Sequence, residues 1–153
     1  MDRYDRQILA ALQVNADRTA EQLTEHVALS ASAIQRRIRH MKKTGAIERV
    51  VALANARQVG APLHFVVSLQ VERERPELLS QLRRWLSNAP QIQQAYYVTG
   101  EADFILVVTA PDAESYDAFM ARLMAENANV HRFLTNLTLG VVKRGLELPI
   151  ETE

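Results

Sequence analysis

The chain has no cysteine among its 153 residues, so it can form neither a disulfide nor a metal site with thiolate ligands. It also lacks any apolar run near the ~18 residues that cross a membrane, and it begins with the charged segment MDRYDR. These absences exclude a disulfide-stabilised scaffold and a membrane-spanning helix. We therefore expect a cytoplasmic protein that makes no membrane contact.

Signatures of enzymes are absent as well. The sequence contains no glycine-rich phosphate loop and no nucleophile motif. Its histidines are scattered without metal-ligand spacing, at His26, His40, His64 and His131. The sequence therefore predicts no catalytic residue, metal ion or cofactor, and we expect these histidines to be surface residues or satisfied core residues.

The 18 basic and 18 acidic side chains cancel overall but are unevenly distributed. Residues 1–50 carry nine Lys or Arg and six Asp or Glu, a net charge of +3, whereas residues 51–153 carry nine against twelve, a net charge of −3. A nucleic-acid-binding N-terminal domain joined to a C-terminal domain of another function would produce this asymmetry.

One segment, LSASAIQRRIRHMKKTGAI at 29–47, predicts a helix suited to nucleic acid. Ser30 can cap its start, because a hydroxyl accepts from a first-turn N–H, and Gly45 suits the left-handed residue that ends a helix. Apolar residues at i, i+4 and i+7 predict one buried stripe. That stripe consists of Ile34, Ile38 and Met41.

Polar and cationic residues gather on the opposite side of this helix, with Gln35 and His40 at its flanks. The central residues of this face are Ser32, Arg36, Arg39 and Lys43. No acidic residue occurs between Glu25 and Glu48, so a duplex backbone would attract the face. The commoner alternative for such a run of charge is a solvated helix surface.

The residues before this helix favour DNA binding over that alternative. Residues 19–27 predict a short helix, because Thr19 and Gln22 have capping-box spacing. A tight turn at 28–29 then leads into Ser30, and residues 1–14 predict a further amphipathic helix. We expect residues 1–47 to form a helix-turn-helix domain, whose second helix enters the major groove.

Residues 48–62 are expected to connect two domains. The β-branched segment IERVVAL at 47–53 predicts a strand, residues 55–59 a helical turn, and Gly60-Ala61-Pro62 a linker.

The second half alternates strands and helices. Alternation at 63–71 predicts a strand with one buried face, and Pro76 predicts the start of a helix with Leu78, Leu82, Trp85 and Leu86 on its apolar side. Strands are expected at 92–98, 103–110 and 130–142, with a helix from 111 between the last two. Residues 63–145 thus predict a βαββαβ, ferredoxin-like domain of the α+β class, followed by a tail at 146–153. Its sheet face without helices carries Val66 and Val141, so we expect a homodimer through this face.

Four strings in order, DRYDRQIL, LSASAIQRRIRHMKKTGAI, IERVVAL with NARQVG, and VTGEADFILVV, together with the terminal KRGLELPI, point to a known family. Through them the whole chain resembles the Lrp/AsnC family of leucine-responsive, feast/famine transcription regulators. The resemblance implies a winged helix-turn-helix that binds double-stranded DNA and a RAM-type domain that dimerises and senses an amino acid. It also implies assembly into tetramers or octamers. Ala28 and Ala31 depart from the family's usual glycine and proline without removing a charge from the binding face.

The resemblance places five residues near the base edges of DNA: Ser32, Ala33, Gln35, Arg36 and Arg39. It assigns Arg37, Lys42 and Lys43 to phosphates, and the helix-capping Ser30 also belongs to the predicted DNA-binding set. An intramolecular pair with an earlier helix is the alternative for Arg37.

The turn at 99–103 is the second candidate site, because glycine allows close backbone approach and exposed N–H groups can receive a carboxylate. Asp103 could pair with an ammonium group. An ordinary hairpin turn is the alternative. With the family's effector pocket as guide, the predicted set is Thr99, Gly100, Glu101 and Asp103, with Thr135, Asn136 and Leu137 on the last strand.

Two other functions fit the same architecture. Siroheme decarboxylases share it, and His64 and His131 are the only histidines in the sheet domain that could serve such an enzyme. An architectural DNA-wrapping protein would need no effector.

Overall fold

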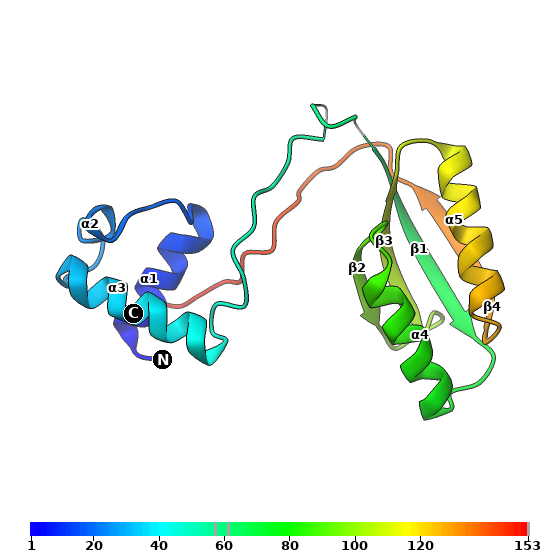
Figure 1. Cartoon of the computed structure of the whole chain (residues 1–153), viewed down its shortest axis with the longest axis horizontal. Coiled ribbons are helices and arrows are strands. Elements are labelled where there is room, and N and C mark those ends of the chain that lie inside the picture. The colour runs from blue at the N-terminus through cyan, green and yellow to red at the C-terminus, as the bar shows by residue number, and fades with distance from the viewer. Residues whose placement is uncertain (57, 61, 153) are drawn as a thin grey trace. The chain divides into compact units, whose positions relative to one another are not determined.

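The computed structural model describes residues 1–56, 58–60 and 62–152, which divide into two compact units (Figure 1). The first unit comprises residues 1–53 together with 143–153, and the second comprises residues 54–142.

Three helices build the first unit: α1 (Arg3–Val14), α2 (Ala20–Leu23) and α3 (Ala31–Thr44). Each has a side-chain cap, since the first-turn N–H groups have no intrahelical partner. Asp2 caps α1 and Thr19 caps α2, both in reciprocal capping boxes, and Ser30 caps α3. The helices share one small core, whose buried members are Ile8, Leu23, Val27, Ile34 and Met41.

Two predictions for this unit need correction. The short helix ends at Leu23 rather than Val27, and the chain continues in hydrogen-bonded turns that still bury Val27. The strand predicted at 47–53 is wrong, because these residues adopt no strand and Val50 and Val51 are exposed. A strand needs a neighbour for its N–H and C=O groups, and the described chain places none beside this segment. The wing that the strand would supply is therefore absent from the described residues.

The connecting segment contains the predicted turn. The Asn55 carbonyl accepts the N–H groups of Gln58 and Val59 at 3.0 and 3.2 Å. Arg57 of this turn and Ala61 of the predicted linker lie outside the described residues, as does Glu153 of the tail.

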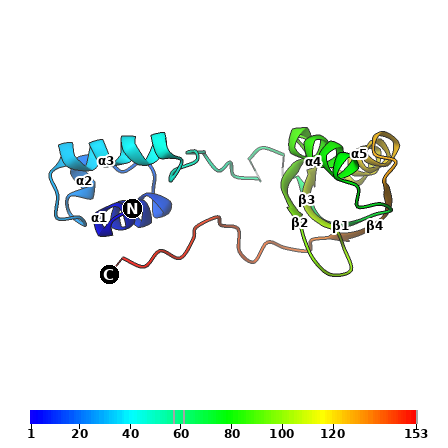
Figure 2. The same ribbon diagram turned by 90° about the horizontal axis from the view of Figure 1, so that it is seen from below.

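The second unit has the predicted βαββαβ order. Its elements are β1 (Leu63–Val71), α4 (Pro76–Asn88), β2 (Ile92–Tyr97), β3 (Phe104–Ala110), α5 (Ala113–Glu126) and β4 (Val130–Leu137). The strands form an antiparallel sheet in the order β2-β3-β1-β4. Both helices cover the same face of this sheet (Figure 2).

The core lies between the sheet and the helices because alternate residues of each strand point toward them. β3 alternates strictly, so Leu106 and Val108 are fully buried while Val107 between them is only half-buried. On α4, Leu79 is buried, whereas the sequence pattern predicted Leu78 on the apolar side of this helix. The last strand ends at Leu137 rather than residue 142. Leu137 pairs with Phe65, so residue 139 would lie opposite Leu63, where β1 begins, and residues 140–142 have no β1 backbone to pair with.

Among the described residues, no helix lies over the second face of the sheet. Half-buried Val66, Ile105 and Val107 lie there beside exposed Leu134 and Tyr96. In the part of the chain that the structure describes, no helix is long and apolar enough to cross a membrane.

Candidate DNA-binding face and effector site

Helix α3 is fixed at both ends and along one side. The Ser30 hydroxyl accepts the Ala33 N–H at 3.3 Å, and Gly45 ends the helix in a left-handed conformation with φ of +80°. Ile34 and Met41 are buried against the other two helices, and Ile38 packs partly against them. These contacts orient the opposite side of α3 toward solvent.

That solvent-facing side carries most of the predicted DNA-binding residues. The exposed ones are Ser30, Ser32, Gln35, Arg36, Arg39, Lys42 and Lys43, whereas Ala33 is half-buried. Among the described residues, no ion pair engages Arg36, Arg39 or either lysine. The cations of this face are therefore available to an anionic partner.

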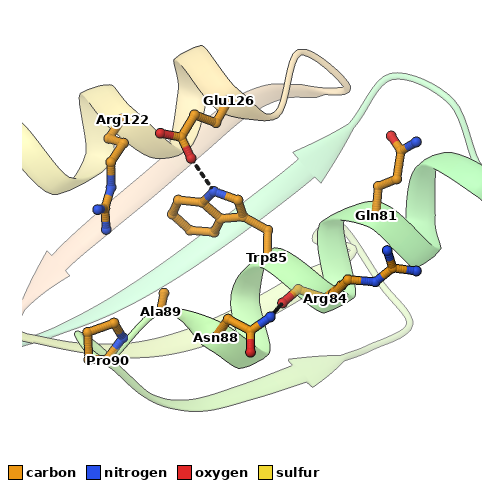
Figure 3. Close-up of a pocket in the computed structure, with 8 residues that line it drawn as sticks. All are labelled: Gln81, Arg84, Trp85, Asn88, Ala89, Pro90, Arg122 and Glu126. Carbon is orange, nitrogen blue, oxygen red and sulfur yellow. Dashed lines mark hydrogen bonds between the residues drawn. The ribbon is translucent and has the colours of Figure 1, made fainter.

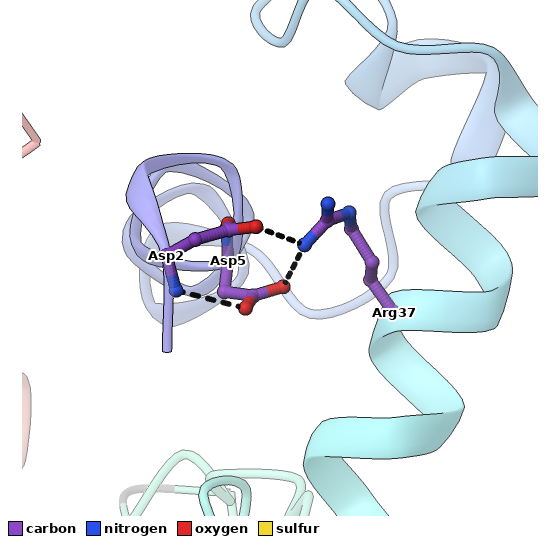
Figure 4. Close-up of polar contacts among 3 residues, drawn as sticks. All are labelled: Asp2, Asp5 and Arg37. Atoms are coloured by element: carbon purple, nitrogen blue, oxygen red, sulfur yellow. Dashed lines mark hydrogen bonds and ion pairs between the residues drawn. The ribbon is translucent and has the colours of Figure 1, made fainter.

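Arg37 has a different position. One nitrogen of its guanidinium lies 2.8 Å from the Asp2 carboxylate and 2.8 Å from the Asp5 carboxylate at the start of α1 (Figure 4). Hydrogen bonds to Asp5 and Asp2 raise the pKa of Arg37. The Asp5 backbone N–H lowers the pKa of Asp2, and Arg37 lowers it further. Of the two roles predicted for Arg37, the structure supports the intramolecular one over a phosphate contact.

The loop at 99–103 lies against the C-terminal end of β1. Gly100 has a φ of +120°, which favours glycine. The Gln70 side-chain amide donates to the Glu101 carbonyl at 2.6 Å and so holds the loop to the open face of the sheet. The side chains of Thr99 and Glu101 are exposed.

Asp103 has a structural role that the sequence did not predict. Its carboxylate accepts the Val71 N–H at 2.7 Å, and its own N–H donates to the Leu69 carbonyl at 2.9 Å. One carboxylate oxygen is thus committed to holding the loop on β1. An ammonium group would have to share this carboxylate with the backbone of Val71.

A hollow of about 160 Å³ opens beside the loop. It is lined by Ser68, Gln70, Glu101, Ala102, Arg132, Phe133 and Leu134. On β4 this hollow is lined by Arg132, Phe133 and Leu134. Residues 135–137 do not line it, and their part in effector binding stays a prediction.

The pairing of β4 with β1 explains why residues 135–137 lie away from this hollow. Thr135 pairs with Val67 and Leu137 with Phe65, and paired residues share a face, so both point toward the helices. The Thr135 hydroxyl accordingly hydrogen bonds to the Tyr116 hydroxyl on α5. Asn136 lies on the open face but pairs with Val66, farther from the loop. The two-residue period of β4 could have grouped Arg132 with Leu134, but one strand alone does not reveal which group faces the loop.

A larger hollow of about 400 Å³ lies on the solvent side of α4 and α5 (Figure 3). Two of its polar side chains bind one another, since the Trp85 indole N–H donates to the Glu126 carboxylate at 2.6 Å. The Arg122 guanidinium lies 5.6 Å from the Trp85 ring centre. These contacts join the two helices, and we assign the hollow a structural role.

Comparisons with known proteins match both halves of the chain. Residues 1–42 match the AsnC-type helix-turn-helix domain, and residues 64–148 match the Lrp/AsnC ligand binding domain. An uncharacterised HTH-type transcriptional regulator of Sinorhizobium fredii, y4tD, is 38% identical over 151 residues, covering 99% of this chain and 89% of the relative. The leucine-responsive regulatory protein of Escherichia coli is 27% identical, covering 99% and 93%.

Solved structures share the fold. An AsnC family transcriptional regulator from Agrobacterium tumefaciens aligns with a TM-score of 0.89 at 32% identity, covering 97% of each chain. A Neisseria meningitidis transcriptional regulator in complex with L-Met aligns with a TM-score of 0.87 at 24% identity, covering 97% of this chain and 96% of that one. With the domain matches spanning both units, these relatives show that the chain belongs to the Lrp/AsnC family of helix-turn-helix transcriptional regulators.

Proposed function

We propose that two copies of this regulator bind a pseudo-palindromic site on cytoplasmic double-stranded DNA, each through α3. The observation that carries this proposal is the exposed face of α3, whose cations have no carboxylate partner among the described residues. Arg36 and Arg39 would each form a bidentate contact with guanine, and Gln35 would hydrogen bond to adenine. Lys42 and Lys43 would neutralise phosphates. Arg37 would support this face by tying α3 to α1.

Fluorescence anisotropy across a salt series tests DNA binding. The probe is a labelled duplex from upstream of the regulator's own gene, compared with a shuffled duplex of the same length. We expect tighter binding to the first duplex and a steep loss of affinity with salt, because phosphate binding releases counterions. Equal binding to both duplexes, or none at low salt, would contradict the proposal.

We infer further that the loop at 99–103 and the adjoining hollow bind an amino acid. Exposed loop N–H groups and Arg132 suit its carboxylate, and Glu101 or the shared Asp103 carboxylate suits its ammonium group. The bound L-Met of the Neisseria regulator supports this ligand class. The hollow of about 160 Å³ is smaller than the ~300–1,000 Å³ of typical ligand pockets, so we propose that a second copy completes it.

Calorimetry with individual amino acids tests this site. Asp103→Asn keeps an oxygen for the Val71 N–H and removes the charge, and Arg132→Gln removes the proposed carboxylate partner. Each change is expected to weaken binding, whereas Arg122→Gln on the far side of the helices should leave it unaltered. Unchanged affinity in both loop-site variants would show that the site is elsewhere.

We propose that the second copy covers the open face of the sheet, and that dimers assemble further into tetramers or octamers. An effector that binds one arrangement of dimers more tightly would shift this assembly, with a coupling of ~1–3 kcal/mol.

We propose no enzymatic role. His64 lies near the start of β1 and His131 near the start of β4. Because the two strands are antiparallel, these positions are at opposite ends of the strand pair, about 20 Å apart at ~3.3 Å per residue. Within one chain the two histidines cannot bind one metal centre together, which disfavours a tetrapyrrole site built from both. Within the described ranges, no group of three histidine, aspartate or glutamate side chains could hold a metal ion.

A further inference from the structure

The C-terminal segment makes an unexpected contact with α1. The Gln13 side-chain amide donates to the Leu148 carbonyl at 2.9 Å, and its oxygen accepts the Leu148 N–H at 2.8 Å. One side chain thus satisfies both backbone groups of a residue 135 positions away, as a neighbouring strand would. The contact uses only the backbone of Leu148, whose side chain stays exposed.

This contact lies within the first unit, to which residues 143–153 belong. The segment runs along the side of α1 that faces away from α3 (Figure 2). Gln13 follows buried Ile8 by five positions, about 140° around the helix, so it points away from the shared core. Docking here leaves the cationic face of α3 uncovered.

The segment that contacts α1 is also continuous with the last strand of the sheet domain. Residues 138–142 continue directly from β4, which contributes Arg132 and Leu134 to the hollow beside the loop. The helix-turn-helix is therefore connected to the sheet domain by two chain segments: the one after residue 53 and the one before residue 143.

We propose that residues 143–152 form a strap that docks on α1 through Gln13 and restrains the helix-turn-helix as a second tether. A domain held by one flexible linker samples many orientations, whereas two connections reduce that freedom before DNA is bound. The strap would thereby fix the separation of the two α3 helices in a dimer and carry changes in β4 to α1. This consequence for DNA rests on the function proposed above, but the docking itself does not.

Hydrogen–deuterium exchange on the full-length protein tests the docking without DNA or effector. We expect slow exchange of the Leu148 amide in the wild type and fast exchange in Gln13→Ala. Gln7→Ala, which changes another half-buried glutamine of α1, is the matched control and should keep the protection. Fast exchange in the wild type, or protection retained in Gln13→Ala, would overturn the proposal.

DNA binding tests the restraint. The probes are the duplex from upstream of the regulator's own gene and the same duplex with about five base pairs, half a helical turn, inserted between its half-sites. The preference of the wild type for the first duplex should fall about three- to tenfold in Gln13→Ala, as expected when preorganisation is lost.

Leu148→Pro removes the N–H donor without altering α1, so it separates loss of the strap from damage to the helix. It should match Gln13→Ala, and Gln7→Ala should match the wild type. An unchanged spacing preference in both strap variants would refute the restraint. No binding of the wild type to either duplex would instead count against the proposed function, and the exchange experiment would still decide the docking.

Discussion

Individual side chains of α3 differ in what they can contact on DNA. Arg36 is exposed without a carboxylate partner among the described residues, whereas its neighbour Arg37 is bound to Asp2 and Asp5. The helical period in the sequence placed Arg36 on the outer face. It could not settle Arg37, because the carboxylates that bind it approach from another helix.

Substituting Arg36 and Lys43 should separate sequence recognition from phosphate binding. Arg36→Ala should cost ~1–3 kcal/mol on the preferred duplex and relax sequence preference, because a forked contact to guanine is lost. Lys43→Ala should weaken binding to all duplexes alike and reduce the salt slope by about one. Anisotropy on preferred and shuffled duplexes measures both, and equal losses on the two duplexes for Arg36→Ala would contradict the division.

The carboxylates that bind Arg37 should make the first unit sensitive to acid. The pKa of Asp2 is lowered in the folded protein by the Asp5 N–H and by Arg37, so its stabilising effect is complete above the unfolded pKa of about 4. That effect is lost as the pH falls through the lower folded value. Asp2→Asn should therefore flatten the fall in the denaturation midpoint of this unit below pH ~4. If the denaturation midpoint of the wild type falls with pH no more steeply than that of Asp2→Asn, the proposed acid sensitivity is contradicted.

Secondary-structure elements were predictable where their determinants are local. The caps Thr19 and Ser30, with the apolar stripes that follow them, lie within a few residues of the helices they define. Strands depend on distant partners, so the sequence predicted a strand at 47–53 that has no neighbouring strand among the described residues, and it extended β4 beyond the start of β1. For the same reason it could not identify Arg132 as the β4 residue beside the loop.

The start of α3 can be tested by substituting its first residue. Ala31 is its first residue, where the N–H has no intrahelical partner, and Ser30 has the φ of −69° and ψ of 152° that suit a residue before proline. Ala31→Pro should stabilise the protein by ~0.4–1 kcal/mol, because it restricts the unfolded chain.

Ala33→Pro is the matched control. It removes the N–H that the Ser30 hydroxyl accepts, so it should destabilise the protein. Chemical denaturation measures both changes, and a destabilised Ala31→Pro would show that the helix does not begin as described.

Within the described part of the whole molecule, no helix covers the open face of the sheet, which is the basis for the proposed dimer. Val107→Asp places a charge on this face and should yield monomers in sedimentation velocity at micromolar concentration. Ala121→Asp adds the same charge on an exposed position of α5 and should leave the dimer intact. A wild-type protein that sediments as a monomer would rule out dimerisation through this face.

We propose that one molecule couples amino-acid binding to DNA binding. Anisotropy tests this coupling by measuring the affinity for the duplex from upstream of the regulator's own gene, with and without a pool of amino acids. We expect the pool to change this affinity by roughly 5- to 150-fold, the usual range of such coupling, and Asp103→Asn to reduce the change. Tight, sequence-selective binding that no amino acid alters would contradict this coupling and favour an architectural DNA-binding protein.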